Sequence, residues 1–138
     1  MRKRKQIDLF CWMLRIKGEE SMNIKEFYDS IKVDPENVYH RFGNNELLLA
    51  KFLKKFLNDT TFLQLTEAIE KNDLEAIFRT AHTLKGLCGN FDFKELYEYS
   101  SKIVECYRAE EYDSISSWYE KLKVCYADTT TKLAVYLD

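Results

Sequence analysis

Four residues in the segment AHTLKGLCGN (81–90) have types and a spacing that could support chemistry: His82, Lys85, Gly86 and Gly89. Their spacing of i, i+3, i+4 and i+7 predicts that they lie together on one face of a helix. An exposed imidazole is mostly neutral near pH 7 and is nucleophilic, so His82 could accept a phosphoryl group. Lys85, one turn away, could offset the negative charge that this group brings.

The same helix carries a second, apolar face, which predicts how it is oriented. A stripe at helical spacing is expected to face the core. This stripe contains Leu74, Ile77, Ala81, Leu84 and Cys88. His82 falls outside it, on a face that is expected to be exposed. Arg79, at i−3 from His82, would add positive charge there, and Phe78 is interpreted as bordering the core rather than as a contact for a partner.

Gly86 and Gly89 are unusual because the helical wheel turns both of them away from the core. A glycine inside a helix costs roughly 0.5–1 kcal/mol relative to alanine. Close packing of two helices is the usual reason for it, but the wheel predicts that both glycines face solvent. We therefore expect that a partner whose backbone approaches His82 needs this surface to be bare.

Each of these residues also has an ordinary explanation. An exposed histidine is most often just a surface residue, a lysine at i+3 is most often a solvated charge, and a glycine within a helix most often marks packing or a kink. Their combination on one outward face favours a functional site. The second histidine, His40, has no such surroundings, and we interpret it as a surface residue.

The elements that must position this segment are predicted to be helices. Asp34-Pro35 is typical of a helix start, and a short helix is expected to end near Arg41, before Gly43-Asn44-Asn45. An amphipathic helix is predicted from Glu46 to Ile69, with a kink near residues 58–61.

Three further helices are predicted from capping patterns. Asn72-Asp73-Leu74-Glu75 is expected to begin the helix that carries His82. Asp92 is expected to cap the next helix, and Asp113 the last one. The fold class is therefore all-α, an antiparallel up-and-down four-helix bundle with a short extra N-terminal helix.

The composition agrees with this fold and excludes several classes of function. The chain of 138 residues has one proline and four glycines, fewer turn residues than a many-stranded fold needs. A net charge of −2 gives no general attraction to nucleic acid. No apolar run has the roughly 18 residues of a membrane span. The four cysteines form no CxxC motif, so we expect no metal site and a reducing, cytoplasmic location.

The first 21 residues are considered separately from the domain expected over 22–138. Lys17-Gly18-Glu19-Glu20 can be encoded by a purine-rich run that resembles a bacterial ribosome-binding site ahead of Met22. Residues 1–21 would then be a translated leader. The alternative is a disordered extension or a short amphipathic helix.

Two segments carry a family resemblance. HTLKG at 82–86, followed by GN at 89–90, resembles the signature of histidine-containing phosphotransfer (HPt) domains, and RFGNNEL at 41–47 resembles the family's entry into its second helix. The resemblance covers about residues 30–137. It implies that His82 is phosphorylated, that Lys85 assists, and that Gly86 and Gly89 form a docking surface.

Two departures from the family's pattern concern neighbours of the motif. Many members have glycine where this chain has Asp92, and Leu87 and Cys88 replace residues that are often small or hydroxylated. Cys88 is expected to face the core. Leu87, on the flank, is expected to add an apolar contact to a partner, and Arg79 is included in the same docking surface.

The resemblance implies a bacterial two-component phosphorelay. His82 would accept a phosphoryl group from the aspartate of a receiver domain and pass it to another receiver. The expected partners are response-regulator receivers or a hybrid histidine kinase, with Mg²⁺ supplied by the receiver and with the chain itself a monomer. The chain has no phosphate-binding loop, so we expect a phosphotransfer intermediate without an ATP site, not an autonomous kinase.

Three alternatives remain open at this stage. The chain could be the separated phosphoacceptor module of a chemotaxis-type histidine kinase, which would use His82 identically but receive the phosphoryl group from ATP. It could be a non-catalytic helical adaptor that binds receivers, although the intact His-x-x-Lys-Gly pattern argues against lost chemistry. A metal-binding four-helix bundle is disfavoured because the predicted core stripes are apolar.

Overall fold

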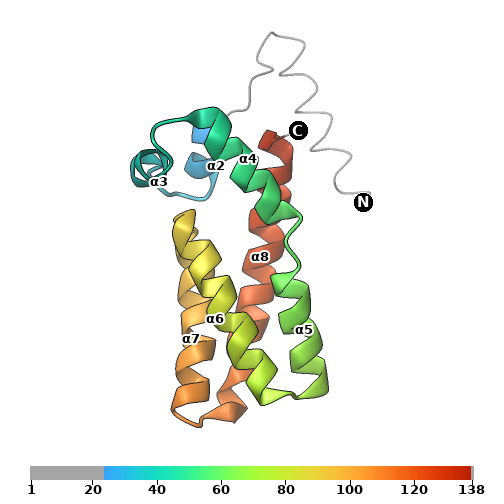
Figure 1. Ribbon diagram of the computed structural model, residues 1–138. Coiled ribbons are helices and arrows are strands. Elements are labelled where there is room, and N and C mark those ends of the chain that lie inside the picture. Colours follow the sequence, from blue (N-terminus) through green and yellow to red (C-terminus); the bar gives the residue numbers. More distant parts are fainter. Residues whose placement is uncertain (1–23, 138) are drawn as a thin grey trace. The chain divides into compact units, whose positions relative to one another are not determined.

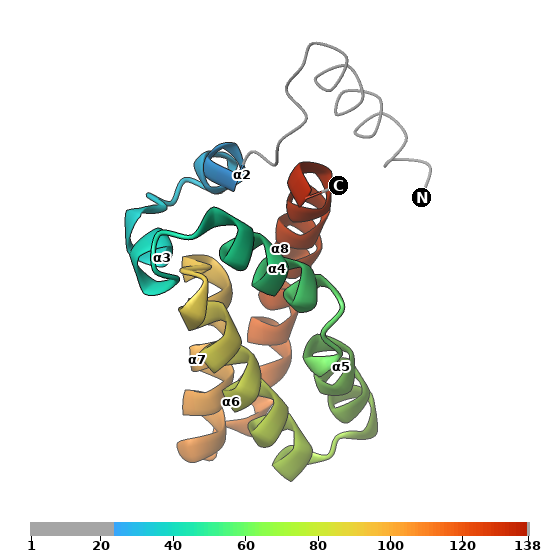
Figure 2. The ribbon, with the colours of Figure 1, turned by 45° about the horizontal axis from the view of Figure 1, so that its top comes forward.

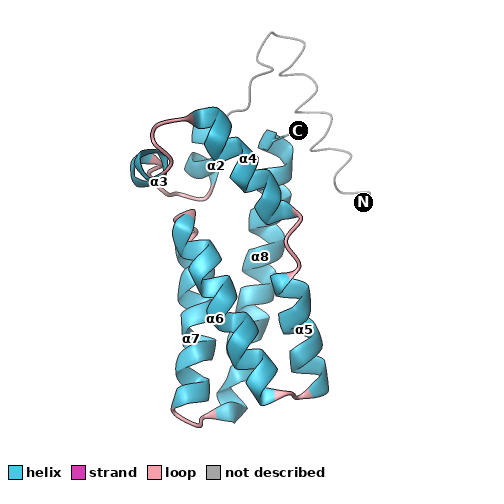
Figure 3. Ribbon diagram, viewed as in Figure 1, coloured by secondary structure: helices cyan, strands magenta, loops and turns pink. Residues whose placement is uncertain are grey.

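The computed structural model describes residues 24–137, and the predictions about residues 1–21 lie outside this range (Figure 1). Within it the chain forms helices and connecting turns without strands, so the all-α prediction is confirmed (Figure 3). The elements are α2 (Ile24–Ser30), α3 (Glu36–Arg41), α4 (Glu46–Leu57), α5 (Thr61–Lys71), α6 (Leu74–Asn90), α7 (Lys94–Arg108), the 3-10 turn η1 (Tyr112–Ser114) and α8 (Ile115–Leu137).

The chain divides into two compact units, and α8 contributes to both. One unit contains α2, α3, α4 and the end of α8 from Asp128 onward. The other, Asn58–Ala127, contains α5, α6, α7, η1 and the first part of α8. The segment with His82 belongs to the second unit, which therefore carries the candidate site.

In the second unit, α5, α6, α7 and the first part of α8 run alternately up and down, and α6 lies beside both α5 and α7 (Figures 1 and 2). This arrangement confirms the predicted antiparallel up-and-down bundle. Its core is built from one apolar face of each helix. The buried apolar residues are Leu65, Ala68, Ile77, Ala81, Leu84, Cys88, Phe91, Phe93, Leu96, Ile103, Val104, Cys106, Ile115, Tyr119 and Leu122.

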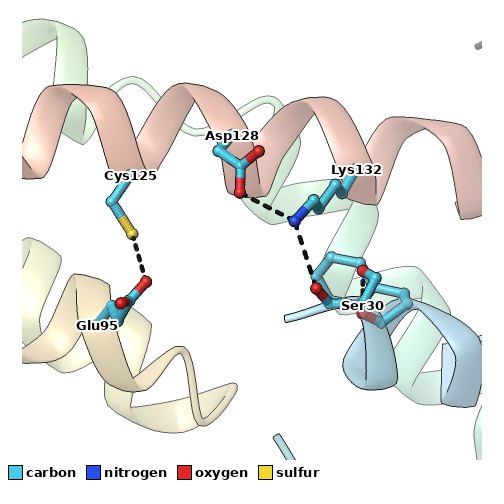
Figure 4. Close-up of polar contacts among 6 residues, drawn as sticks. Ser30, Glu95, Cys125, Asp128 and Lys132 are labelled. Carbon is cyan, nitrogen blue, oxygen red and sulfur yellow. Dashed lines mark hydrogen bonds and ion pairs between the residues drawn. The ribbon is translucent and has the colours of Figure 1, made fainter. Parts of the chain in front are cut away.

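A polar contact and an aromatic stack join α5 to α8 in this bundle. The hydroxyls of Thr66 and Tyr119 are 2.7 Å apart, and the rings of Phe62 and Tyr126 stack with centroids separated by 4.1 Å. The thiol of Cys125 donates to a carboxylate oxygen of Glu95 at 3.5 Å, from α8 to α7 (Figure 4). Side chains of α5 and α7 thus hold α8 within the unit.

The prediction of one continuous helix from Glu46 to Ile69 is wrong in the middle of this range. The structure has a break between α4 and α5 in place of a kink. The amide of Thr61 donates to Oδ1 of Asp59 at 2.7 Å, and the side-chain amide of Gln64 donates to Oγ1 of Thr60 at 3.0 Å. The carboxylate of Asp59 thus gives the amide of Thr61 a partner other than that of a continuing helix.

The predicted cap at Asp73 is confirmed, whereas the start predicted at Asp34-Pro35 is off by one residue, because Pro35 occupies the N-cap position and α3 begins at Glu36. Oδ1 of Asp34 accepts the amide of Glu36 at 3.0 Å before α3, and Oδ1 of Asp73 accepts the amide of Ala76 at 3.2 Å at the start of α6. Asn72 does not contribute to the cap at the start of α6, because it ends α5 in a left-handed conformation. Both aspartates satisfy amides that the first helical turn leaves unpaired.

Two other predicted caps are wrong. Asp92 has φ 58°, and α7 begins at Lys94 with Phe93 at the N-cap position. The amide of Phe93 instead donates to the carbonyl of Cys88 at 3.0 Å, so this turn closes α6. Glycine would adopt this left-handed conformation without the cost that Asp92 bears. Asp113 lies within η1, which precedes α8.

The first unit has its own contacts. Nζ of Lys132 donates to the carbonyl of Ser30 at 3.3 Å and forms an ion pair with Asp128 at 3.1 Å (Figure 4). The hydroxyl of Tyr39 donates to a carboxylate oxygen of Glu46 at 2.6 Å. These contacts tie α2 to the end of α8 and α3 to α4.

Candidate functional site

Helix α6 holds His82 in solvent by burying its opposite side. Ile77, Ala81, Leu84 and Cys88 are buried as predicted, whereas Leu74, in the first turn, is only half-buried. In the sequence, His82 stands between the buried residues Ala81 and Leu84. Its own side chain is exposed, on the outer surface of α6. The predicted orientation of the helix is therefore confirmed, and the imidazole is accessible to another molecule.

Gly86, one turn beyond His82, faces open space. A Cβ atom built at this position would have no heavy atom within 4 Å, apart from its own helix and chain neighbours. No packing requirement in the described part of the chain therefore explains a glycine at this position. The surface beside His82 is bare, as the helical wheel predicts.

Gly89 differs from Gly86, and the prediction that it faces open solvent is wrong. A Cβ atom here would lie 3.3 Å from Cδ1 and 3.4 Å from Cε1 of Tyr97. Tyr97 comes from α7 and its ring covers this part of α6. The helical wheel missed this contact because it locates only the core side of α6 and does not show which side chains of α7 reach over its edge.

Lys85 lies over the same tyrosine ring. Its Nζ is 5.7 Å from the centroid of Tyr97, within the range of a cation–π interaction. Lys85 is half-buried, so its aliphatic stem packs on the protein while the ammonium group stays at the surface. Lys85 follows His82 by about one helical turn, so its side chain begins on the face of α6 that also carries His82.

Phe78, one turn before His82, lies at the edge of the contact between α6 and α7. Its ring stacks on Tyr107 with centroids 4.6 Å apart, and the guanidinium carbon of Arg108 lies 5.4 Å from its centroid. The side chain is half-buried. Phe78 thus borders the core, as interpreted from the sequence, and one of its neighbours is the ring of His82 at 5.9 Å.

A shallow hollow of about 370 Å³ opens beside His82, on the side of α6 that meets α5. Six of its seven lining residues have polar side chains, and none of the described residues that form it is acidic. They are Thr61, Gln64, Phe78, Arg79, Thr80, His82 and Thr83. Arg79 is exposed at this hollow, and Leu87 is half-buried on the flank of α6. An anionic group at His82 would meet no carboxylate among these residues.

The buried thiol of Cys88, on the same helix as His82, does not offer a competing nucleophile. Burial raises the pKa of the Cys88 thiol far above its usual value, and the nearby Cys125 and Asp59 raise it further. A thiol that stays protonated is a poor nucleophile. Among residues 24–137, no group of three or more histidine, cysteine, aspartate or glutamate side chains is placed to hold a metal ion.

Comparison with known proteins identifies the family. The family model described as the Hpt domain matches residues 48–130, and the chain therefore belongs to the HPt domain family. HPt domains carry out histidine phosphotransfer in phosphorelay signalling and interact with receiver domains and kinases. Searches of curated proteins and of solved structures found no match. None of the helices between residues 24 and 137 has the length and apolar character needed to cross a membrane.

The residue that sequence reasoning missed is Tyr97. It sits on α7 among polar residues, with nothing in its spacing that connects it to His82. Its placement depends on the turn at Phe91–Phe93, which brings the start of α7 alongside the end of α6. A signal existed in Gly89, because a glycine within a helix is often covered by a side chain of a neighbouring helix.

Proposed function

We propose that His82 is the phosphoacceptor of this HPt domain and that the chain relays the phosphoryl group between receiver domains. One nitrogen of the imidazole attacks the phosphorus of an aspartyl phosphate. The new N–P bond forms as the P–O bond to the aspartate breaks, and the receiver's carboxylate leaves. The same steps in reverse order transfer the phosphoryl group to the next receiver.

The observation that carries this proposal is the open surface next to an exposed imidazole. A receiver must bring its aspartyl phosphate within bonding distance of His82, and in-line transfer tolerates little misplacement. The absence of any described side chain within 4 Å of a Cβ at Gly86 leaves room for that approach. Arg79 and Leu87, on either side of this surface, are further contacts that we assign to the receiver.

Charge at the site also supports phosphoryl acceptance. The incoming group is strongly anionic, and a neighbouring cation stabilises it through charge-assisted contacts. Lys85 is half-buried one turn from His82, and Arg79 is exposed one turn before it. The receiver would supply the Mg²⁺ that balances the rest of the charge, so this chain needs no metal ligands of its own.

The experiment compares the two histidines of the chain, which provide a matched pair. The protein is incubated with isotopically labelled phosphoreceivers and, separately, with labelled phosphoramidate, a small donor that needs no docking surface. Wild type and His40→Gln should take up label, and His82→Gln should not, with unchanged helical content by circular dichroism. The label should be lost in acid and kept in base, as expected for a phosphoramidate bond.

Two outcomes would contradict the proposal. Label on a folded His82→Gln protein would place the acceptor elsewhere, and an acid-stable label would indicate serine, threonine or tyrosine. The identity of the phosphoryl donor indicates where this chain acts in the pathway. Labelling from a kinase with ATP but from no phosphoreceiver would favour the phosphoacceptor module of a chemotaxis-type kinase.

A further inference from the structure

The ring of Tyr97 lies directly on the backbone of α6 at Gly89. A Cβ atom at Gly89 would be 3.3 Å from the ring, a distance at which the neighbour must move by a few tenths of an ångström. The Gly86 position, one turn from His82, has no comparable neighbour. Glycine is therefore present at these two positions for different structural reasons. Gly86 leaves the surface bare, and Gly89 makes room for an aromatic ring.

The same ring lies under the ammonium group of Lys85. Lys85 precedes Gly89 by one turn, so the ring that rests on the glycine is in reach of the lysine side chain, and Nζ is 5.7 Å from its centroid. A lysine side chain otherwise samples many rotamers, and this freedom is lost when the ammonium group must meet a phosphoryl group. A fixed ring limits those rotamers before the phosphoryl group arrives.

An aromatic ring suits this task better than a carboxylate would. A carboxylate beside Lys85 would neutralise its charge, whereas a ring attracts the cation through its quadrupole and leaves the net charge in place. Among the described residues, no carboxylate forms an ion pair with Lys85. Tyr97 is itself 43% exposed and Lys85 is half-buried, so neither side chain is sealed from solvent.

We infer that Tyr97 is a positioning residue, which holds the ammonium group of Lys85 beside His82, and that Gly89 is glycine because this ring must lie on α6. The inference rests on the proposed function of His82. It assigns Gly89 to the support of Lys85 rather than to receiver docking, and it adds a residue of α7 to a site otherwise built on α6.

A double-mutant cycle on Lys85 and Tyr97 tests this directly. The measured quantity is the rate at which labelled phosphoramidate modifies His82, because this donor does not depend on docking. Tyr97→Leu should slow labelling by about two- to fivefold, the size expected for a cation–π contact at a partly exposed site. Tyr97→Phe keeps the ring and should retain the wild-type rate. In the Lys85→Ala background, Tyr97→Leu should cause no further slowing.

Gly89→Ala provides a second route that does not alter the tyrosine. The added methyl group would displace the ring by a few tenths of an ångström, so this variant should slow labelling, but by no more than Tyr97→Leu does. Its effect should disappear when Tyr97 is already leucine. The matched control is Tyr112→Leu, because Tyr112 is 40% exposed, similar to Tyr97, and no cation among residues 24–137 lies over its ring. Its labelling rate should stay at the wild-type value.

The outcomes separate this inference from the proposed function. If Tyr97→Leu labels His82 at the wild-type rate, or slows labelling equally with and without Lys85, Tyr97 does not act through the lysine and the inference is wrong, while His82 remains the acceptor. If wild type takes up no label at His82 from any donor, the proposed function itself is wrong. Circular dichroism and melting temperatures confirm that each variant compared is folded.

Discussion

The ring of Phe78 lies against the imidazole of His82, with the ring centroids 5.9 Å apart and the planes inclined by 41°. Phe78 also contacts α7, where Tyr107 stacks on it and Arg108 lies over it. One side of the imidazole therefore meets an aromatic ring that is itself held by a neighbouring helix. On the same helix, one turn beyond His82, Gly86 has no side chain at all.

We expect Phe78→Leu to lower the free energy of unfolding by about 1–2 kcal/mol. The variant keeps an apolar side chain but loses the stack on Tyr107, and aromatic pairs contribute about 0.5–1.5 kcal/mol beyond the area they bury. Urea denaturation followed by circular dichroism measures the change. Tyr107→Leu should lose a similar amount, and the double variant should lose less than the sum. Strict additivity would mean that the two rings do not stabilise each other.

Substitutions at Gly86 should separate stability from docking. Gly86→Ala should raise the free energy of unfolding by roughly 0.5–1 kcal/mol, because alanine loses less backbone entropy in a helix and the added methyl group meets nothing. Gly86→Gln should also fold. Its longer side chain would stand beside His82 and slow transfer from a phosphoreceiver at least tenfold, since a misplacement of about 1 Å can cost 100-fold.

The small donor supplies the control for Gly86. Phosphoramidate should still label His82 in Gly86→Gln, because it needs no docking surface. A Gly86→Gln protein that fails to fold would show that the glycine serves packing. Normal transfer from the phosphoreceiver in a folded Gly86→Gln protein would show that the receiver does not approach over this face.

Glu110→Gly should stabilise the bundle. Glu110 follows α7 with φ 59°, a left-handed conformation that costs a non-glycine residue roughly 1–2 kcal/mol, and its side chain is exposed. Glycine adopts this conformation without that cost, so the melting temperature should rise. Glu110→Ala keeps the unfavourable conformation and should give no gain. Equal melting temperatures for the two variants would contradict this explanation.

Alkaline pH should destabilise the protein in part through Tyr126. Burial raises the pKa of Tyr126 from 10.0 to about 12, and Asp59 and Cys88 add to the effect. Between pH 10 and 12 the unfolded tyrosine releases its proton while the folded one keeps it, so unfolding becomes more favourable as the pH rises. The contribution of protonated Tyr126 to the stability of the fold is complete below pH 10 and is lost as the pH rises through 12.

The measurement for Tyr126 is the urea midpoint of wild type and Tyr126→Phe from pH 8 to 12. The variant should lose less stability over this range, because phenylalanine has no proton to release. Parallel curves for the two proteins would show that Tyr126 titrates equally in the folded and unfolded states.

Much of the site could be predicted from the sequence because it depends on one helix. The spacing of Ile77, Ala81, Leu84 and Cys88 determines the buried side of α6, and this alone turns His82 and Gly86 outward. The cap at Asp73 is equally local, since its side chain bonds an amide three residues away. Helical periodicity and capping act within a few residues, so they can be recognised before the packing of the helices is known.

Only the tertiary structure decided what covers the outer edge of α6. Gly89 and Gly86 are equivalent by sequence, yet one lies under Tyr97 and the other faces open space. The difference arises at the turn after α6, where Asp92 takes a left-handed conformation. Helix α7 therefore begins at Lys94, and not directly after Asp92, the predicted cap. That turn decides which residue of α7 reaches Gly89 and Lys85. Periodicity describes each helix relative to its own core, whereas a contact between two helices depends on the turn and packing that set them side by side.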